Sequence, residues 1–163
     1  VYKVKDFEFV DGIFDLTKEA IVKGYLIIVI TNQAGIGRGL YNLNVFNVLT
    51  DWMSEEFMKN SILLSKVYFS PYHPVHGKGR YKKDHISRKP NPGMIYQARE
   101  DFNIDLSRSV LIGDKLSDIK AGQDAGIRTN ILYTGNDAIN LDSEYACHLV
   151  SSLNEAKVFL LDG

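Results

Sequence analysis

The feature that most constrains the fold is a regular alternation of short apolar runs with longer amphipathic stretches. The apolar runs occupy residues 26–31, 66–70, 109–112, 129–133 and 148–150. They are continuously apolar rather than apolar at every second residue, which is typical of parallel strands that are covered on both faces. Strands that alternate with helices indicate an α/β fold of three layers, α/β/α, with a Rossmann-like parallel sheet in the middle and ligands at the carboxyl ends of its strands.

The stretches between the apolar runs have the period of helices. One long helix is predicted by apolar residues at intervals of three and four: Val45, Phe46, Leu49, Trp52, Met53 and Phe57. A similar stripe predicts an earlier helix that ends at Gly24, and another helix is expected over residues 117–125. We find no internal repeat, linker or low-complexity segment, so one domain is expected over residues 1–163.

Composition excludes several classes of protein. The net charge of -1 and the pI near 6.5 argue against a protein that coats nucleic acid or a membrane surface. No apolar stretch approaches the roughly 18 residues that a membrane-spanning helix needs. The single cysteine, Cys147, allows no disulfide within these residues and is expected to be a small buried apolar side chain. We expect a monomer in the cytoplasm, with neither a nucleic acid nor a membrane as its partner.

Polar residues gather near the ends of the apolar runs. Thr31-Asn32-Gln33 follows the first run, Arg88-Lys89-Pro90 comes before the third, and residues 113–118 follow the third with Asp114 and Asp118. These residues supply hydrogen-bond donors, fixed positive charge and a hard oxygen ligand for a divalent cation. Phosphoryl transfer needs such groups, because its main demand is positioning and charge neutralisation. An obvious nucleophile is not among them.

The constellation resembles the haloacid dehalogenase (HAD) superfamily of aspartate-nucleophile phosphatases. Four segments carry the resemblance in order, at residues 6–12, 31–39, 88–94 and 113–116. The fit is closest to the branch that acts on D-glycero-D-manno-heptose 1,7-bisphosphate. The resemblance implies a magnesium-dependent enzyme that removes the 7-phosphate of this small sugar bisphosphate through an aspartyl-phosphate intermediate.

The resemblance assigns roles to the segment after the first apolar run. The Thr31 hydroxyl and a nearby backbone N–H would hold the transferring phosphoryl group, while Asn32 and Gln33 would orient the substrate. Ala34 and Arg38 are also expected to contact the substrate. The glycines of this segment have neither the G-x-G-x-x-G spacing of a dinucleotide site nor the G-K-[ST] of a P-loop. A turn cap is the alternative role for the polar residues here.

The second polar segment carries two adjacent cations. Lys89 matches the family lysine that bridges the nucleophile and the phosphoryl oxygens, where a fixed ammonium offsets the repulsion between two anions. Arg88 could grip a second phosphate, since its planar guanidinium suits bidentate binding of oxyanions. The alternative is a solvated basic loop, which the neighbouring cations favour: Lys78, Arg80, Lys82 and Lys83.

The third polar segment is expected to hold Mg²⁺. Asp114 follows a strand directly, and Mg²⁺ prefers carboxylate oxygens and retains several waters. Asp118 is expected to support this site from outside the metal's direct ligands, or to favour the start of the following helix by its negative charge. By resemblance Lys115 contacts the phosphate, although it could equally be an inert loop lysine.

The sequence departs from its branch in the residues that would bind zinc. Relatives often carry a Cys-x-His and a Cys-x-Cys pair before the Arg-Lys-Pro segment, whereas this chain has Ser70 with Tyr72 and His85 with Ser87. Serine and tyrosine are poor zinc ligands, so no structural zinc is expected. The histidines of this loop are expected to be solvated. Residues 71–91 must then be ordered by packing or by substrate.

The family's central first strand, which ends in the nucleophilic aspartate pair, has no counterpart in residues 1–163. Asp11 and Asp15 do not replace the pair, because they follow no buried strand. Without that strand, two half-sheets would each expose an unpaired inner edge. We therefore expect an apolar strand that ends in Asp-x-Asp to be encoded upstream of Val1, unless another source supplies it.

Three other functions remain open on the sequence alone. Histidinol-phosphate phosphatases are close relatives in the same branch. Polynucleotide 3′-phosphatases share the Thr-Asn-Gln and Gly-Arg-Gly pattern, but this chain shows no evident basic surface for nucleic acid. A non-catalytic sugar-phosphate-binding protein is the alternative if the aspartate pair is truly absent.

Overall fold

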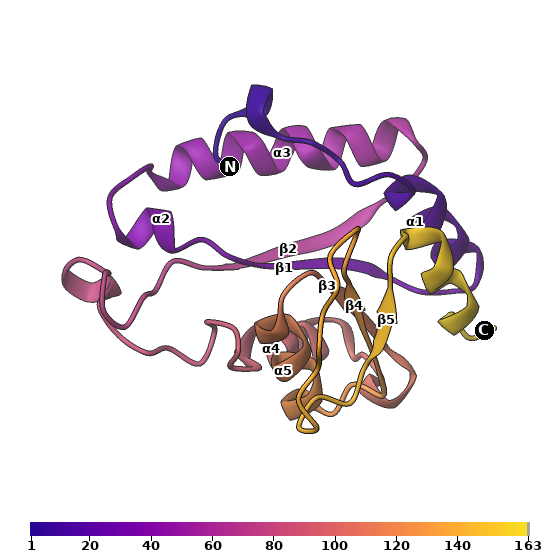
Figure 1. Cartoon of the computed structure of the whole chain (residues 1–163). Helices are drawn as coiled ribbons and strands as arrows, with labels where there is room; N and C mark the ends of the chain where they lie inside the picture. The colour runs from indigo at the N-terminus through magenta and orange to yellow at the C-terminus, as the bar shows by residue number, and fades with distance from the viewer. Residues whose placement is uncertain (163) are drawn as a thin grey trace.

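The computed structural model describes residues 1–162, and its five strands form two parallel sheets (Figure 1). One sheet pairs β1 (Ile27–Asn32) with β2 (Leu64–Ser70). The other has the order β3 (Val110–Gly113), β4 (Thr129–Tyr133) and β5 (His148–Val150). All five strands lie where the apolar runs predict them, within two residues at each end.

The three predicted helices are all observed, and the structure adds two α-helices for which no bounds were predicted, Ala34–Gly37 and Gly93–Phe102. The α-helices are α1 (Ile13–Val22), α2 (Ala34–Gly37), α3 (Leu43–Lys59), α4 (Gly93–Phe102) and α5 (Leu116–Ala125). Short 3₁₀ helices are η1 (Val4–Asp6), η2 (Gly79–Tyr81), η3 (Leu106–Arg108) and η4 (Leu153–Phe159). Among the described residues, none of these helices has both the length and the apolar character that crossing a membrane requires.

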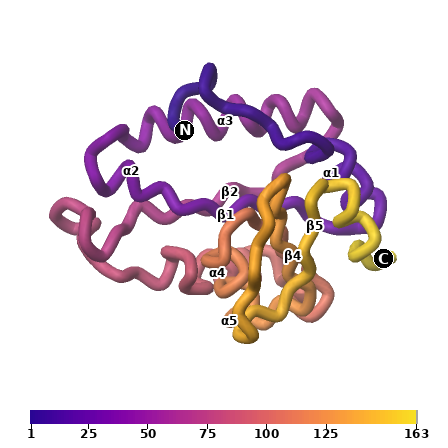
Figure 2. Tube along the Cα trace, in the orientation of Figure 1, coloured from indigo at the N-terminus to yellow at the C-terminus, as the bar shows by residue number. Residues whose placement is uncertain are grey.

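Helices cover both faces of the sheets, which gives the expected three layers (Figure 1). On one face, α4 and α5 pack on Ile30, Leu111 and Leu132. On the other, α1 and η4 pack on Ile131 and Val150. The long helix α3 lies above the β1–β2 sheet, and the N-terminal segment runs along it (Figure 2). Because each strand is covered on both sides, apolar residues are favoured at successive positions rather than alternate ones.

The two sheets leave a cleft between β1 and β3. In the part of the chain that the structure describes, β1 pairs only with β2, and β3 only with β4. A cavity of about 900 Å³ lies between the two inner edges, and we call it the cleft. Its apolar lining includes Ile28 and Ile30 of β1, Leu111 of β3 and Ile95 of α4, and it reaches Thr31, Lys89 and Asp114. The cleft therefore joins unpaired strand edges to the polar residues that the sequence singled out.

The aspartates of the first segment lie away from those polar residues. Asp11 and Asp15 flank the start of α1, which packs against η4. In Figure 1, α1 lies at the end of β1 opposite to α2, and Thr31 is at the α2 end. This placement agrees with the expectation that Asp11 and Asp15 do not replace the nucleophile pair.

Candidate active site

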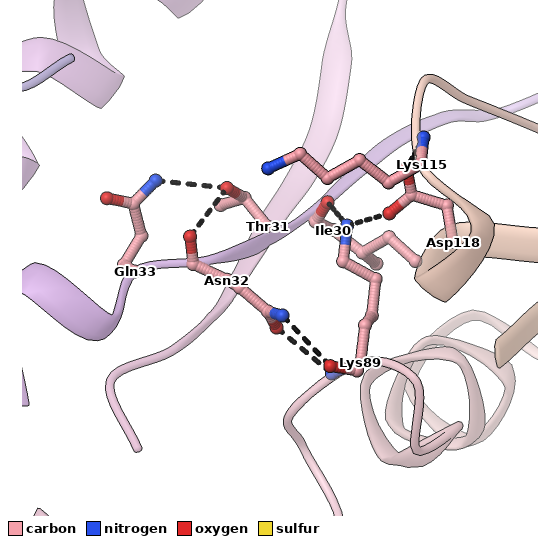
Figure 3. A network of polar contacts seen from close by, with 7 residues as sticks. All are labelled: Ile30, Thr31, Asn32, Gln33, Lys89, Lys115 and Asp118. Atoms are coloured by element: carbon pink, nitrogen blue, oxygen red, sulfur yellow. Dashed lines mark hydrogen bonds and ion pairs between the residues drawn. The ribbon is translucent and has the colours of Figure 1, made fainter. Parts of the chain in front are cut away.

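Side chains from three separated segments meet where β1 ends, and together we call them the polar corner. It consists of Thr31 and Asn32 at the end of β1, Lys89 in the loop before α4, and Asp118 in the first turn of α5 (Figure 3). Carboxyl ends of parallel strands and N-termini of the helices that follow face the same edge of an α/β sheet, which is where such folds bind ligands. The expected meeting of the three polar segments is therefore observed.

The amide of Asn32 fastens the Lys89 segment to the end of β1. Its Nδ2 donates to the Lys89 carbonyl at 3.0 Å, and its Oδ1 accepts from the Lys89 backbone N–H, also at 3.0 Å. Both polar atoms of the amide are thus used on one backbone unit that lies 57 positions away in the sequence. Contact between Asn32 and a substrate stays a prediction, while its role in placing Lys89 is visible directly (Figure 3).

The ammonium of Lys89 is held from two sides. Its Nζ pairs with Asp118 Oδ1 at 2.5 Å and donates to the Ile30 carbonyl at 3.4 Å. The two side chains are only 12% and 8% exposed, respectively, so this ion pair is shielded from water. A charge in such a place interacts more strongly than one in bulk solvent. An anion at this corner would therefore meet a fixed and poorly solvated positive charge.

Asp118 also fixes the start of α5. Its Oδ2 accepts from the Lys115 backbone N–H at 3.0 Å, which satisfies a donor that the helix leaves free. Gly113 makes this position possible, since a Cβ there would lie 2.4 Å from the Cβ of Asp118. Of the two roles expected for Asp118, the helix-start role is observed together with an ion pair to Lys89.

Thr31 and Gln33 form the edge of the corner where β1 leads into α2. Gln33 Nε2 donates to Thr31 Oγ1 at 3.0 Å, and Tyr41 donates its phenol proton to Gln33 Oε1. Ala34 is the first residue of α2, and Gln33 occupies the N-cap position without a capping bond from its side chain. The amide of Gln33 is thus engaged within the protein, and its contact with a substrate stays a prediction.

Asp114 and Lys115 lie at the exposed rim of the corner. Asp114 lines the cleft together with Thr31 and Lys89. One hard carboxylate there fits Mg²⁺, which in phosphate-processing sites is held by one or two carboxylates, by waters and by substrate phosphate. Within residues 1–162, no three side chains of His, Cys, Asp or Glu gather into a metal-binding group. The donor set suits magnesium bound jointly with a phosphate, and the Lys115 side chain extends toward Thr31 (Figure 3).

Residues 71–88, which we call the distal loop, bring further cations near the corner. Arg88 Nη1 donates to the Tyr72 carbonyl at 3.2 Å, and this side chain is half-buried. Partial burial, Arg88, His76 and Arg38 together lower the pKa of His73. The outer cations of the loop are exposed: Lys78, Arg80, Lys82 and Lys83.

The four residues that the sequence analysis weighed as a zinc site come together in this chain: Ser70, Tyr72, His85 and Ser87. Ser87 Oγ donates to Ser70 Oγ at 2.9 Å and lies 2.7 Å from His85 Nδ1. The ring of Tyr72 stacks on that of His85, with centroids 4.0 Å apart. Ser70 is fully buried. Hydroxyl, imidazole and phenol groups thus connect the distal loop to the end of β2.

Sequence reasoning missed several of these contacts. The ties from Lys89 to Asn32 and Asp118, and from Tyr41 to Gln33, were not foreseen. A signal existed only for Asp118, since an acid at the third position of a helix is a common cap. Nothing in the sequence pattern singles out Tyr41.

Comparison with known proteins agrees with the site. A family model described as HAD-hydrolase-like matches residues 86–156. The chain is 51% identical over 138 residues to the D-glycero-alpha-D-manno-heptose-1,7-bisphosphate 7-phosphatase of Burkholderia mallei, covering 85% of this chain and 73% of that one. It is 38% identical over 162 residues to the D-glycero-beta-D-manno-heptose-1,7-bisphosphate 7-phosphatase of Vibrio cholerae, covering 99% and 87%.

A solved structure shares the fold. It is the D,D-heptose 1,7-bisphosphate phosphatase of B. bronchiseptica, complexed with magnesium and phosphate, which matches with a TM-score of 0.77 at 20% identity. The match covers 98% of this chain and 86% of that one, and at this identity it speaks for the fold alone. The sequence relatives are much closer and extend over most of their own length. The chain therefore belongs to the HAD-like hydrolases, close to the D-glycero-D-manno-heptose-1,7-bisphosphate 7-phosphatases.

Proposed function

We propose that this chain forms most of a magnesium-dependent phosphatase that removes the 7-phosphate of D-glycero-D-manno-heptose 1,7-bisphosphate. The observation that carries the proposal is the polar corner, where the shielded ammonium of Lys89 and the hydroxyl-bearing Thr31 line one cavity. Close relatives with this activity support the substrate. They act on different anomers, so the anomer that this chain prefers is left to experiment.

In this mechanism, the residues of the corner bind and neutralise the transferring phosphoryl group. The Lys89 ammonium lowers the repulsion between an anionic nucleophile and the phosphate dianion, and Asp118 and Asn32 keep it in place. The Thr31 hydroxyl donates to a phosphoryl oxygen. Asp114 would hold Mg²⁺, which screens charge on the phosphate when it is bound.

We further propose that the cleft receives an apolar strand that ends in Asp-x-Asp and is encoded upstream of Val1. The unpaired edges of β1 and β3, the apolar lining and the opening toward Lys89 support this proposal. The first aspartate would attack phosphorus as the sugar oxygen leaves. The second would protonate that oxygen and later activate the water that releases phosphate.

The distal loop is proposed to bind the second phosphate without help from zinc. Arg88 is half-buried beside the corner and has guanidinium donors beyond the one that the Tyr72 carbonyl takes. The Ser70–Ser87–His85 contacts support a loop ordered by hydrogen bonds. Elemental analysis of purified protein should find substoichiometric zinc, and chelator-treated enzyme should recover with magnesium alone. Recovery only with zinc would contradict this part of the proposal.

Two measurements test the function. Full-length enzyme should hydrolyse the heptose bisphosphate with a higher kcat/KM than histidinol phosphate; faster turnover of histidinol phosphate would overturn the substrate. A synthetic peptide of about six apolar residues that ends in Asp-x-Asp should raise the melting temperature of the 163-residue chain, since strands of this length are common. A scrambled peptide of the same composition is the control. Equal effects of the two peptides would refute strand insertion. The cytoplasmic location and the monomeric state stay predictions.

A further inference from the structure

A line of three hydrogen-bonding side chains ends at the hydroxyl of Thr31. Tyr41, in the connection between α2 and α3, donates its phenol proton to Gln33 Oε1. The other end of the same amide, Gln33 Nε2, donates to Thr31 Oγ1 at 3.0 Å (Figure 3). In both hydrogen bonds the donor is the residue farther from β1 and the acceptor is the next residue toward β1, so the two bonds have the same orientation.

The local backbone is shaped to admit the phenol of Tyr41. A Cβ at residue 35 would lie 2.1 Å from Tyr41 Cε1, so only glycine leaves room for the ring there. The Leu40 N–H donates to the Gly35 carbonyl at 2.9 Å, which turns the chain back onto α2. On its outer side the ring stacks on Tyr2, with centroids 5.0 Å apart. The position of the phenol is therefore fixed from both sides.

The phenol of Tyr41 remains a donor at neutral pH. Its partial burial raises the pKa of Tyr41 above the ordinary value for tyrosine. A protonated phenol that gives its hydrogen to Gln33 Oε1 leaves the NH₂ end of that amide pointing at Thr31. Tyr41 thereby selects one of the two orientations that an amide can adopt.

The number of hydrogen bonds that the Thr31 hydroxyl can donate and accept determines its role toward a ligand. Its hydroxyl has one proton, and an acceptor lone pair is already used by Gln33. Among the described residues, the acceptor that the Thr31 proton reaches is the Asn32 carbonyl at 3.5 Å, at the limit of a hydrogen bond. The proton is therefore available to an anion in the polar corner.

We propose that Tyr41, acting through Gln33, is a positioning residue that keeps the Thr31 hydroxyl as a donor toward the transferring phosphoryl group. This inference rests on the proposed function, because it presumes that Thr31 contacts that group. Tyr41 does not touch the substrate. It keeps Thr31 as the donor in the contact with the phosphoryl group, so that the Gln33 amide does not have to rotate by about 180° when that group binds.

A double-mutant cycle on full-length enzyme tests the proposal. Tyr41→Phe keeps the ring and its stacking on Tyr2 but removes the donor. It should lower kcat/KM by about three- to tenfold, the size expected for one neutral hydrogen bond. In a Thr31→Val background, where no hydroxyl remains to be oriented, Tyr41→Phe should have no further effect. Tyr96→Phe is the matched control, since its hydroxyl binds the Asp124 carbonyl on the surface.

The outcomes separate this inference from the function on which it rests. An equal loss from Tyr41→Phe in both backgrounds would overturn the positioning role and show only general structural damage. If Thr31→Val itself leaves kcat/KM unchanged, the phosphate contact of Thr31 fails, and the inference fails with it.

Gln33→Glu provides a second measurement that does not need turnover. The carboxylate has the shape of the amide but accepts hydrogen bonds, so the Thr31 proton would turn toward it. The dissociation constant of inorganic phosphate should rise by roughly tenfold or more, and by more than in Gln33→Leu. Equal phosphate affinity in wild type and Gln33→Glu would contradict the proposed polarity.

Discussion

The polar corner and the distal loop, two neighbouring regions of the site, are held in different ways. In the corner, Lys89 is tied to residues 57 and 29 positions away, and its charge is shielded from water. In the distal loop most bonds are local, such as those from the N–H groups of Val75 and His76 to His73 Nδ1, and the outer cations are exposed. A firmly held corner suits binding of the phosphoryl group, which all phosphate esters share. A loop with local bonds suits recognition of the rest of the substrate molecule, which differs between esters.

If the distal loop binds the second phosphate as proposed, substitutions in the corner should affect every phosphate ester, whereas those in the loop should affect only the bisphosphate. The reason is that interactions with the reacting group differ between ground state and transition state, while a distal anchor supplies binding energy only to a substrate that has a second anion.

Lys89→Ala should give the largest loss. Without the shielded ammonium, the transition state loses a fixed positive charge, and kcat/KM should fall by about 10²–10³-fold, as when a preorganised donor is removed. The loss should be equal for the heptose bisphosphate and for an aryl phosphate. Lys82→Ala, an exposed lysine of the distal loop, is the control. A loss confined to the bisphosphate would show that Lys89 binds the second phosphate rather than the reacting one.

Asp118→Asn should destabilise the folded protein. The amide can still accept from the Lys115 N–H, but Lys89 is left as a nearly buried charge without its partner. Removal of one partner of a buried pair costs about 3–5 kcal/mol, so the free energy of unfolding in urea should fall by an amount near the lower end. Asp124→Asn, which breaks the exposed pair with Lys120, is the control. Equal small changes in both variants would show that the Lys89 pair is solvated.

Arg88→Ala should lower kcat/KM for the heptose bisphosphate much more than for an aryl phosphate. Loss of a charge-assisted contact to the second phosphate costs roughly 1.5–3 kcal/mol, or about one to two decades in kcat/KM for the bisphosphate. Hydrolysis of an aryl phosphate should change little. Arg80→Ala tests a guanidinium of the same loop that lies over the Tyr81 ring. If Arg88→Ala lowers both activities equally, the anchoring role is refuted.

Ser87→Ala should have the smallest effect. It removes the hydroxyl that joins Ser70 to His85, at a cost of about 1 kcal/mol in the free energy of unfolding. Because this contact orders the loop that carries Arg88, KM for the bisphosphate should rise, while kcat on an aryl phosphate stays the same. Ser107→Ala, at an exposed helix start, is the control for a lost hydroxyl. An unchanged KM would mean that packing alone orders the distal loop.

Much of the fold was predictable because it follows from local patterns. Continuous apolar runs predicted β4 and β5 at their observed bounds, and the stripe from Val45 to Phe57 predicted α3. These patterns are readable because burial on two faces, or on one stripe, dictates residue type at fixed intervals. The polar residues at the strand ends also had to meet, since a parallel sheet brings those ends to one edge.

The partner of each polar side chain was decided by the tertiary structure. The sequence shows that Asn32 and Lys89 belong to one site, but not that the amide of one would bind the backbone of the other. It shows Ser70 and Ser87 in place of thiolates, but not that their hydroxyls would meet.

The physical reason is the range of the interactions involved. Hydrophobic burial depends on the kind of residue at each position and can therefore be recognised from the sequence. A hydrogen bond depends on a distance and an angle between two atoms, which segments far apart in sequence acquire only when they pack. Residue patterns along the chain thus predicted the five strands, three of the helices and the polar corner of this phosphatase relative. The packed structure decided that Tyr41 reaches one end of the Gln33 amide and that the other end reaches the Thr31 hydroxyl.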